Sequence, residues 1–293
     1  MTITAAQVKE LRERTGVGMM ECKKALSAAG GDMELAIEEL RKSGRTKADK
    51  KAGRIAAEGI VIIRTTTDGK TAVMVEINSE TDFVGRDENL LSFADAVAKT
   101  VLASKVQDVA ALGALPLAGS TVSVEEARQT LVGKVGENIN IRRIVLVNAN
   151  TTVGTYSHGN RIGVLVELDS ENAELAKDIA MHIAASKPLV IAPEDVSQEL
   201  IAKEKEIYMA QAASSGKPQE ILEKMVGGKL KKFLDEVSLM GQPFVKDPEV
   251  IVSSLLSKNR AKVVSFTRFE VGEGIEKETE DFVEAVMSQV HGG

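Results

Sequence analysis

The stretch Thr71-Ala-Val-Met-Val-Glu-Ile-Asn78, with Ser79 and Glu80 after it, sets the fold class expected for this chain. Its alternation of apolar and polar side chains predicts a half-buried strand. A related run, Gly163-Val-Leu-Val-Glu-Leu-Asp-Ser-Glu171, returns about ninety residues later. The two runs share residue types in register: Val73, Val75, Glu76, Ser79 and Glu80 match Val164, Val166, Glu167, Ser170 and Glu171. This repeat predicts two related α+β subdomains with antiparallel sheets.

Each run leads into a predicted helix, Leu90–Leu102 in the first copy and Leu175–Ala185 in the second. The connection is five residues longer in the first copy, and the extra length contains Thr81-Asp-Phe-Val84. Phe is scarce, with 7 in the chain. An aromatic side chain on a rigid scaffold is typical of an interface anchor. Phe83 is therefore predicted to contact another protein, and the alternative is that it covers the first turn of the helix that comes next.

The flanking segments supply the remaining elements. A capping box at Thr4 and Gln7 and breaks at Thr15-Gly-Val-Gly18 and Gly30-Gly31 predict three short helices that close at Ser43-Gly44. The basic run Arg45–Arg54 comes next as a linker or an exposed helix. In the two copies, the patterns predict a type I′ hairpin at Asp68-Gly69 and a strand over Ile141–Val147 that opens the second copy. A coiled-coil hairpin is predicted over about 193–237, with its turn at Ser214-Ser-Gly-Lys-Pro218. A strand over Val263–Val271 and a terminal helix are predicted to end the chain.

Composition excludes several classes of function. A net charge of -6 with no Trp and 3% aromatic residues argues against a general nucleic-acid binder. Three His and one Cys have no metal-ligand spacing, so no metal or cofactor is expected. No run approaches a membrane span or a signal peptide, and the single Cys22 suits a reducing compartment, which predicts a cytoplasmic protein.

Catalytic motifs are weak throughout. The Gly-x-Gly of Gly16-Val-Gly18 follows a helix rather than a strand, and no phosphate-binding loop occurs. His158 lacks a nucleophile motif that it could serve as a base, and a turn histidine is more often solvated or part of a binding surface. His182 lies in an apolar helical stripe and is expected to be structural. The run Gly133–Arg143 fits a helix C-cap followed by a strand, with Arg142-Arg143 as a possible exposed pair.

Five motifs together resemble the bacterial elongation factor Ts family, in the same order and over essentially the whole chain. They are Leu11-Arg-Glu-Arg-Thr-Gly-Val-Gly-Met-Met-Glu-Cys-Lys-Lys-Ala-Leu26, Thr81-Asp-Phe-Val84, Gly136-Glu-Asn-Ile-Asn-Ile-Arg-Arg143, His182-Ile-Ala-Ala-Ser-Lys-Pro188 and Phe269-Glu-Val-Gly-Glu-Gly274.

The resemblance implies guanine nucleotide exchange on elongation factor Tu, bound with GDP or nucleotide-free, by a protein that is not itself an enzyme. It implies a ubiquitin-associated-like helical domain with linker (1–54), core subdomains (55–140 and 141–280, with the hairpin inserted) and a C-terminal module (281–293). By similarity, Thr81, Asp82, Phe83 and Val84 enter the partner beside its magnesium. Further contacts map onto Lys23, Val135, Gly136, His158 and Val245, and Lys246 stands at a position that is hydrophobic in the family.

Two alternatives belong to other classes. An RNA-binding protein would use the basic stretch Arg45–Arg54, and its affinity would fall steeply with salt. An enzyme would hydrolyse GTP by itself, and the sequence predicts no such activity.

Overall fold

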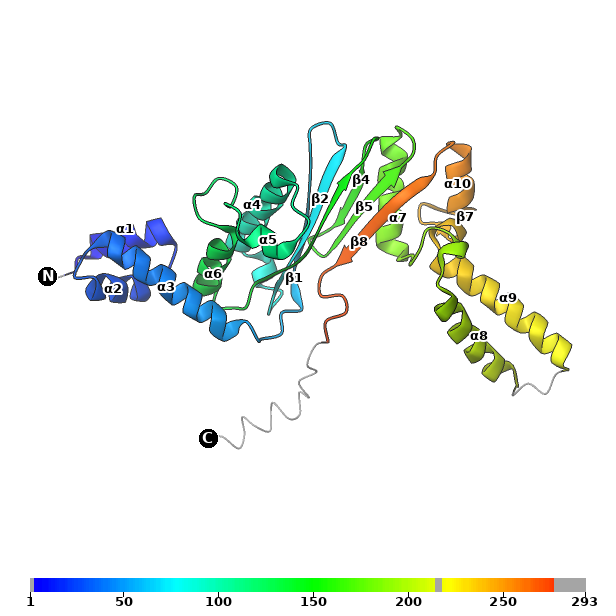
Figure 1. The fold of residues 1–293 in the computed structure, drawn as a ribbon, viewed down its shortest axis with the longest axis horizontal. Helices are drawn as coiled ribbons and strands as arrows, with labels where there is room; N and C mark the ends of the chain where they lie inside the picture. The colour runs from blue at the N-terminus through cyan, green and yellow to red at the C-terminus, as the bar shows by residue number, and fades with distance from the viewer. Residues whose placement is uncertain (1–2, 214–217, 277–293) are drawn as a thin grey trace. The chain divides into compact units, whose positions relative to one another are not determined.

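A computed structural model describes residues 3–213 and 218–276. It has the predicted α+β class, with helices and small sheets, and it divides into two compact units (Figure 1). Among the described residues, the first unit holds 3–62, 75–145 and 270–276, and the second holds 63–74 and 146–269. The domain boundaries at 54, 140 and 280 remain predictions, and the predicted C-terminal helix lies outside the described residues, as does most of the turn at 214–218.

Three helices open the first unit: α1 (Ala5–Thr15), α2 (Met19–Ala28) and α3 (Met33–Lys51). The capping box of Thr4 with Gln7 is present, and Gly16 ends α1 with φ +67°, a conformation that glycine adopts without strain. One apolar face of each helix packs into a shared cluster that includes Leu11, Cys22 and Leu26. The predicted three-helix arrangement is confirmed to this extent.

The third helix does not close at Gly44, so that prediction is wrong. It continues to Lys51 and crosses α6 (Val124–Val135) at Gly44. A methyl group added at Gly44 would lie 3.4 Å from the Gln129 carbonyl oxygen, and one at Gly133 would lie 3.3 Å from the Gly44 Cα. Glycine therefore serves here to let two helix backbones approach closely, not to end a helix.

The first sheet has the order β1-β2-β3, with β1 at Glu58–Thr65, β2 at Thr71–Ser79 and β3 at Asn140–Asn148. The turn between β1 and β2 is not type I′, which requires positive φ at both central residues. Gly69 has φ +69°, but Asp68 does not have a positive φ. The Asp68 carboxylate instead accepts hydrogen bonds from the Thr66 hydroxyl (2.6 Å) and the Lys70 N–H (3.0 Å). These bonds stabilise a longer loop.

The repeat is visible in the topology. The second sheet has the order β4-β5-β8, with β4 at Gly154–His158, β5 at Ile162–Leu168 and β8 at Val263–Glu270. The helix after β2 is α4 (Glu88–Ser104), and the helix after β5 is α7 (Ala173–Ser186). The strand predicted over Ile141–Val147 therefore does not open the second copy. It is β3, the third strand of the first sheet, and its counterpart is β8.

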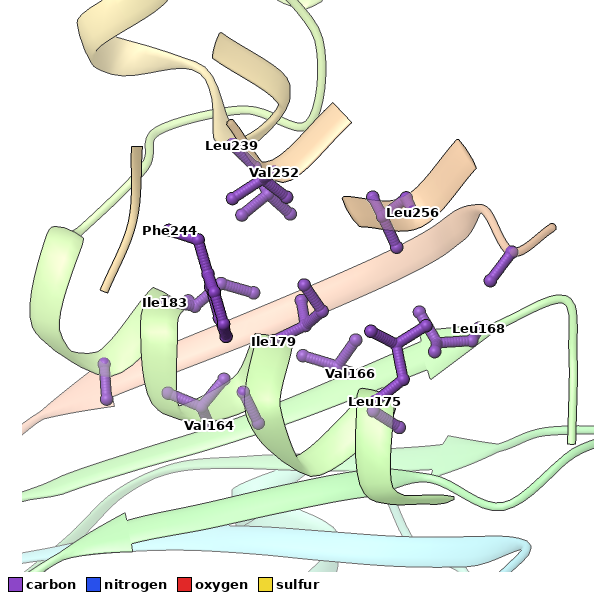
Figure 2. Close-up of a cluster of buried hydrophobic side chains, with 14 residues drawn as sticks. Val164, Val166, Leu168, Leu175, Ile179, Ile183, Leu239, Phe244, Val252 and Leu256 are labelled. Carbon is purple, nitrogen blue, oxygen red and sulfur yellow. The ribbon is translucent and has the colours of Figure 1, made fainter. Parts of the chain in front are cut away.

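One large apolar cluster organises the second unit (Figure 2). Helix α7 packs against β4 and β5, and its far side meets α10 (Val252–Lys258) and a short connection that begins at Leu239. The matched positions of the repeat are buried in both copies: Val73 and Val75 with Val164 and Val166, and Phe93, Ala94, Val97 and Ala98 with Ile179, Ala180, Ile183 and Ala184.

The remaining elements are short, apart from one pair of helices. In the second unit, α8 (Gln198–Ala213) and α9 (Gln219–Val237) pack side by side (Figure 1). A small ribbon of β6 (Pro243–Phe244) and β7 (Asp247–Ile251) lies between α9 and α10 in the chain, and α5 (Val109–Gly113) precedes α6 in the first unit. Short 3-10 turns cover 84–86, 193–195 and 239–241. None of the helices within the described ranges is long and apolar enough to span a membrane.

Strand β2 is buried along its whole length, so the prediction of a half-buried strand is wrong. Glu76 is 0% exposed, and its carboxylate pairs with Arg142 (3.1 Å) and Arg143 and accepts the Gly272 N–H (2.9 Å). Both arginines lie on β3 and are partly buried, so they are not an exposed pair. Burial raises the pKa of Glu76, but the Gly272 N–H and Arg143 outweigh it and hold that pKa below its usual value.

Candidate protein-binding site

The loop that follows β2 is fixed to the turn that follows α6. Thr81 donates two hydrogen bonds to the Glu137 carboxylate, from its N–H (2.9 Å) and from its hydroxyl (2.6 Å). In return, the Glu80 carboxylate accepts the Asn138 N–H (2.6 Å). Bonds that involve a charged acceptor are about twice as strong as neutral ones. The segment 80–83 is therefore held at its base by the neighbouring turn.

Phe83 projects from this loop with its side chain 80% exposed. Its backbone is ordered, because its carbonyl oxygen accepts the Arg86 N–H (3.1 Å) at the start of a 3-10 turn. The alternative in which Phe83 covers the first turn of the next helix is wrong, because a covering side chain would be buried. An exposed phenylalanine on an ordered backbone can offer apolar area to another protein without a rearrangement of the loop.

The neighbours of Phe83 divide between surface and core. Asp82 is exposed, and its carboxylate lies 3.4 Å from the Arg86 guanidinium, a weak surface pair. Val84 is 8% exposed and thus belongs to the core under the loop. Gly85 approaches β1 so closely that an added methyl group would lie 3.0 Å from the Gly59 carbonyl oxygen. Of the four residues in the predicted contact segment, three are at the surface and Val84 anchors them.

Val135 and Gly136 lie beside this loop at the end of α6. Gly136 ends the helix with φ +84°, and its carbonyl oxygen accepts a hydrogen bond from the Lys51 ammonium group. The expected helix C-cap followed by a strand is thus confirmed. A surface hollow brings these parts together with the loop between α1 and α2. It is lined by Arg12, Gly16, Val17, Gly18, Met19, Phe83, Val84, Asp87, Asn89, Lys134 and Val135.

Lys23 belongs to the same unit but not to this hollow. It is exposed on α2, outside the apolar face that buries Cys22 and Leu26. The hollow itself has one cationic wall, where the Lys134 ammonium group donates to the Asn89 side chain (2.6 Å). A neighbouring cavity of about 440 Å³ lies between α3, α4 and α6 and shares Val17, Asn89 and Lys134 with the hollow. None of the predicted contact residues lines it.

The second unit carries the other two predicted contacts. His158 is exposed at the end of β4, where its Nδ1 lies 3.3 Å from the Tyr156 hydroxyl. Val245 is 43% exposed in the β6–β7 ribbon, and its N–H donates to Nδ1 of the buried His182 (3.2 Å). Lys246 beside it pairs with Asp178 (2.6 Å), so its charge has a partner within the chain.

His182 is structural, as the sequence predicts. Its Nδ1 accepts the Val245 N–H, so its Nε2 carries the proton and donates to the Gln242 side-chain oxygen (3.0 Å). Burial lowers the pKa of His182, against a smaller opposing effect of the Gln242 hydrogen bond. The ring is therefore neutral near pH 7, and it orients the ribbon that presents Val245.

Two features that were considered as catalytic motifs in the sequence can be compared with the structure. The Gly-x-Gly at Gly16–Gly18 joins two helices and does not follow a strand, so it is not a dinucleotide loop. Across the described ranges, no three His, Cys, Asp or Glu side chains come together as metal ligands would. Sequence reasoning missed Glu137 as the group that holds Thr81. The only signal was an acidic residue directly after the helix-ending Gly136, and its partner lies 56 positions earlier.

Known proteins with similar sequences span the whole chain. The family model described as elongation factor TS matches residues 80–273. The elongation factor Ts of Thioalkalivibrio sulfidiphilus (strain HL-EbGR7) is 60% identical over 294 residues, which cover 100% of both chains. The elongation factor Ts of Legionella pneumophila (strain Paris) is 56% identical and that of Coxiella burnetii (strain RSA 493 / Nine Mile phase I) 54%, each with 99% of both chains covered.

Proposed function

The chain belongs to the elongation factor Ts family, and on that premise we propose that it is the guanine nucleotide exchange factor for elongation factor Tu in translation elongation. It binds the GDP complex of that partner, inserts the Asp82–Phe83 loop and dislocates magnesium in the partner. GDP then leaves and GTP replaces it. The observation that carries the proposal is the exposure of Phe83 on an ordered loop.

The energetics follow from linkage between two ligands of one protein. A factor that binds the nucleotide-free partner more tightly than the loaded partner must weaken nucleotide binding by the same ratio. Phe83 supplies this difference if its apolar side chain is covered only in the opened partner. Magnesium is the largest charge near the phosphates, so its loss weakens the hold on GDP. The exchange factor needs no nucleotide pocket of its own for this task.

The remaining contacts extend the same surface. Thr81 and Val84 hold the inserted loop, Val135 lines the hollow beside Phe83, and Gly136 follows Val135 at the end of α6. Lys23 contributes from the N-terminal helices, and His158 and Val245 contribute from the second unit. The helices of residues 1–54, the core subdomains 55–140 and 141–280 and the module 281–293 act as the domains that carry these contacts.

The protein acts in the cytoplasm by binding, without enzyme activity, cofactor or nucleic acid. The RNA-binding alternative rests on the basic stretch 45–54, and the structure gives three of its cations other partners. Lys47 pairs with Glu21, Lys51 binds the Gly136 carbonyl oxygen, and Arg54 pairs with Glu80 (3.4 Å). A titration with RNA at rising salt separates the two functions, because binding to phosphates weakens steeply with salt.

The decisive experiment measures nucleotide release. Elongation factor Tu loaded with fluorescent GDP is mixed with this protein and excess unlabelled GDP, and the fluorescence decay is followed. We expect the decay to accelerate with protein concentration and to saturate. Release at the spontaneous rate at every concentration would refute the proposal.

A further inference from the structure

Two loops of the first unit, one after β2 and one after α6, are joined by hydrogen bonds. A carboxylate from each loop accepts hydrogen bonds from donors in the other loop. Glu80, at the end of β2, accepts the N–H of Asn138, and Glu137 accepts the N–H and the hydroxyl of Thr81. The three donor–acceptor distances are 2.6, 2.9 and 2.6 Å. The exchange is reciprocal, so neither loop can shift along the other without loss of bonds to charged acceptors.

The loop that contains Asn138 is the buried and immobile partner in this junction. Asn138 is 2% exposed, and its side-chain amide donates to the carbonyl oxygens of Arg54 (2.8 Å) and Ala52 (3.4 Å). Its backbone therefore cannot move independently of the segment that follows α3. Glu137 directly precedes it, in the turn between α6 and β3, and is held in place by this neighbour.

The loop that contains Thr81 is the exposed partner in this junction. Thr81 is exposed, so water could satisfy its polar groups, and the bonds to Glu137 are not required to offset burial. Every hydrogen-bonding group of Thr81 is nevertheless engaged, since its carbonyl oxygen accepts the Ser79 hydroxyl (2.9 Å). Because the N–H, the hydroxyl and the carbonyl oxygen of Thr81 are all hydrogen-bonded, Thr81 orients the residues that follow it, Asp82 and Phe83.

We propose that Glu137 is a positioning residue for the Asp82–Phe83 loop. It does not contact the partner's magnesium or nucleotide; it fixes Thr81 so that Phe83 leaves the loop in one direction. The inference rests on the proposed exchange function. Without Glu137 the free protein holds Thr81 and Asp82 in more conformations, although the Arg86 N–H still binds the Phe83 carbonyl oxygen. Binding to the partner then bears the entropy of ordering these two residues.

The kinetic test compares Glu137→Ala with the wild type in the fluorescent GDP assay. The ordering penalty falls on binding, so the concentration for half-maximal exchange rises about tenfold, which corresponds to 1.4 kcal/mol. The maximal rate at saturation stays within about twofold, because the bound loop reaches the same geometry. A global folding defect would also raise the apparent half-maximal concentration, because fewer molecules are active, and it is recognised by a lower free energy of unfolding of Glu137→Ala in urea.

A conservative variant and a matched control sharpen the test. In Glu137→Gln the amide oxygen can accept the Thr81 N–H while the amide nitrogen donates to the Thr81 hydroxyl. We expect half-maximal exchange within about threefold of the wild type. Glu199→Ala removes an exposed glutamate from α8, in the second unit, and should leave exchange unchanged. If Glu137→Gln is as impaired as Glu137→Ala, positioning by these hydrogen bonds is refuted.

A readout on the isolated protein separates this inference from the proposed function. The Thr81 amide hydrogen loses its acceptor in Glu137→Ala and should exchange with solvent at least about fivefold faster, while amides of α7 keep their rates. Unchanged Thr81 exchange would overturn the positioning role whatever the nucleotide assay gives. If the wild type fails to accelerate GDP release, the exchange function falls, and amide exchange alone then decides the role of Glu137.

Discussion

The substitution Phe83→Ala separates binding from folding more cleanly than any other change in this chain. The side chain is 80% exposed in the free protein, so nearly all of its apolar surface is available to a partner. The backbone at residue 83 is held by the 3-10 turn and not by the ring. Truncation to alanine therefore removes the contact surface and leaves the loop in place.

The size of the effect follows from the exposed area. A phenylalanine side chain covers about 150–250 Å² when buried. Covering four-fifths of it at about 25 cal/mol per Å² is worth about 3–5 kcal/mol. We expect exchange on elongation factor Tu to fall about 100-fold or more at low factor concentration. The free energy of unfolding should change by no more than about 0.5 kcal/mol, as at other surface positions.

Val84→Ala is the matched control, because Val84 is the buried neighbour of Phe83 in the chain. Its truncation should lower the free energy of unfolding by about 2 kcal/mol through lost burial and a small cavity. Fluorescent GDP release and urea unfolding, measured on both variants, give the comparison. The reasoning is refuted if Phe83→Ala costs stability like a core residue while nucleotide release continues at the wild-type rate.

Three further changes probe the fold that supports the site. Glu76→Gln should be less stable than the wild type at pH 7. Because the folded-state pKa of Glu76 lies below its usual 4.5, the ionised carboxylate stabilises the fold above that value, and this stabilisation is lost as pH falls below it. The urea unfolding curves of the two proteins should therefore converge in acid, and a constant difference would contradict this reasoning. Gly44→Leu should destabilise the chain by about 1–3 kcal/mol by separating α3 from α6. Gly44→Ala should change the free energy of unfolding by less than about 1 kcal/mol. If urea unfolding showed equal losses of stability for the two variants, the close helix crossing would be excluded. The depressed pKa of His182 makes wild-type stability decline as pH falls below its usual value of 6.5, and His182→Gln, followed by thermal unfolding of the second unit, should lack this decline.

The exposed loop was predictable because the chain contains its own comparison. The repeat keeps the same buried positions in both copies, so an insertion in one copy alone is not needed for the scaffold. Phe83 could therefore be singled out from residue types and spacing. The helices were predictable for a related reason, since caps such as Thr4 with Gln7 act within one turn.

The features that the sequence could not reveal depend on partners far along the chain. Alternation assigns Glu76 to solvent, and only its ion pairs with Arg142 and Arg143, 66 and 67 positions later, make its burial possible. A glycine such as Gly44 is equally consistent with a helix end and with a close helix crossing, and only the packing of α3 against α6 distinguishes the two. Glu137 is ambiguous in the same way, because an acidic residue after a helix is ordinary until its acceptor role for Thr81 is seen.

The bond from the Gly272 N–H to the Glu76 carboxylate sets an order of assembly during synthesis on the ribosome. The first unit has received nearly all of its chain by Val145, yet the donor that completes the shell around Glu76 is made 127 residues later. At about 5–20 residues per second, translation takes about 6–25 s to cross that interval. During that time the carboxylate has only the Asn78 side chain and the two β3 arginines as partners, while the rest of the second unit is synthesised. A factor proposed to serve translation elongation thus depends on late elongation to complete the hydrogen bonds around Glu76 in its own first unit.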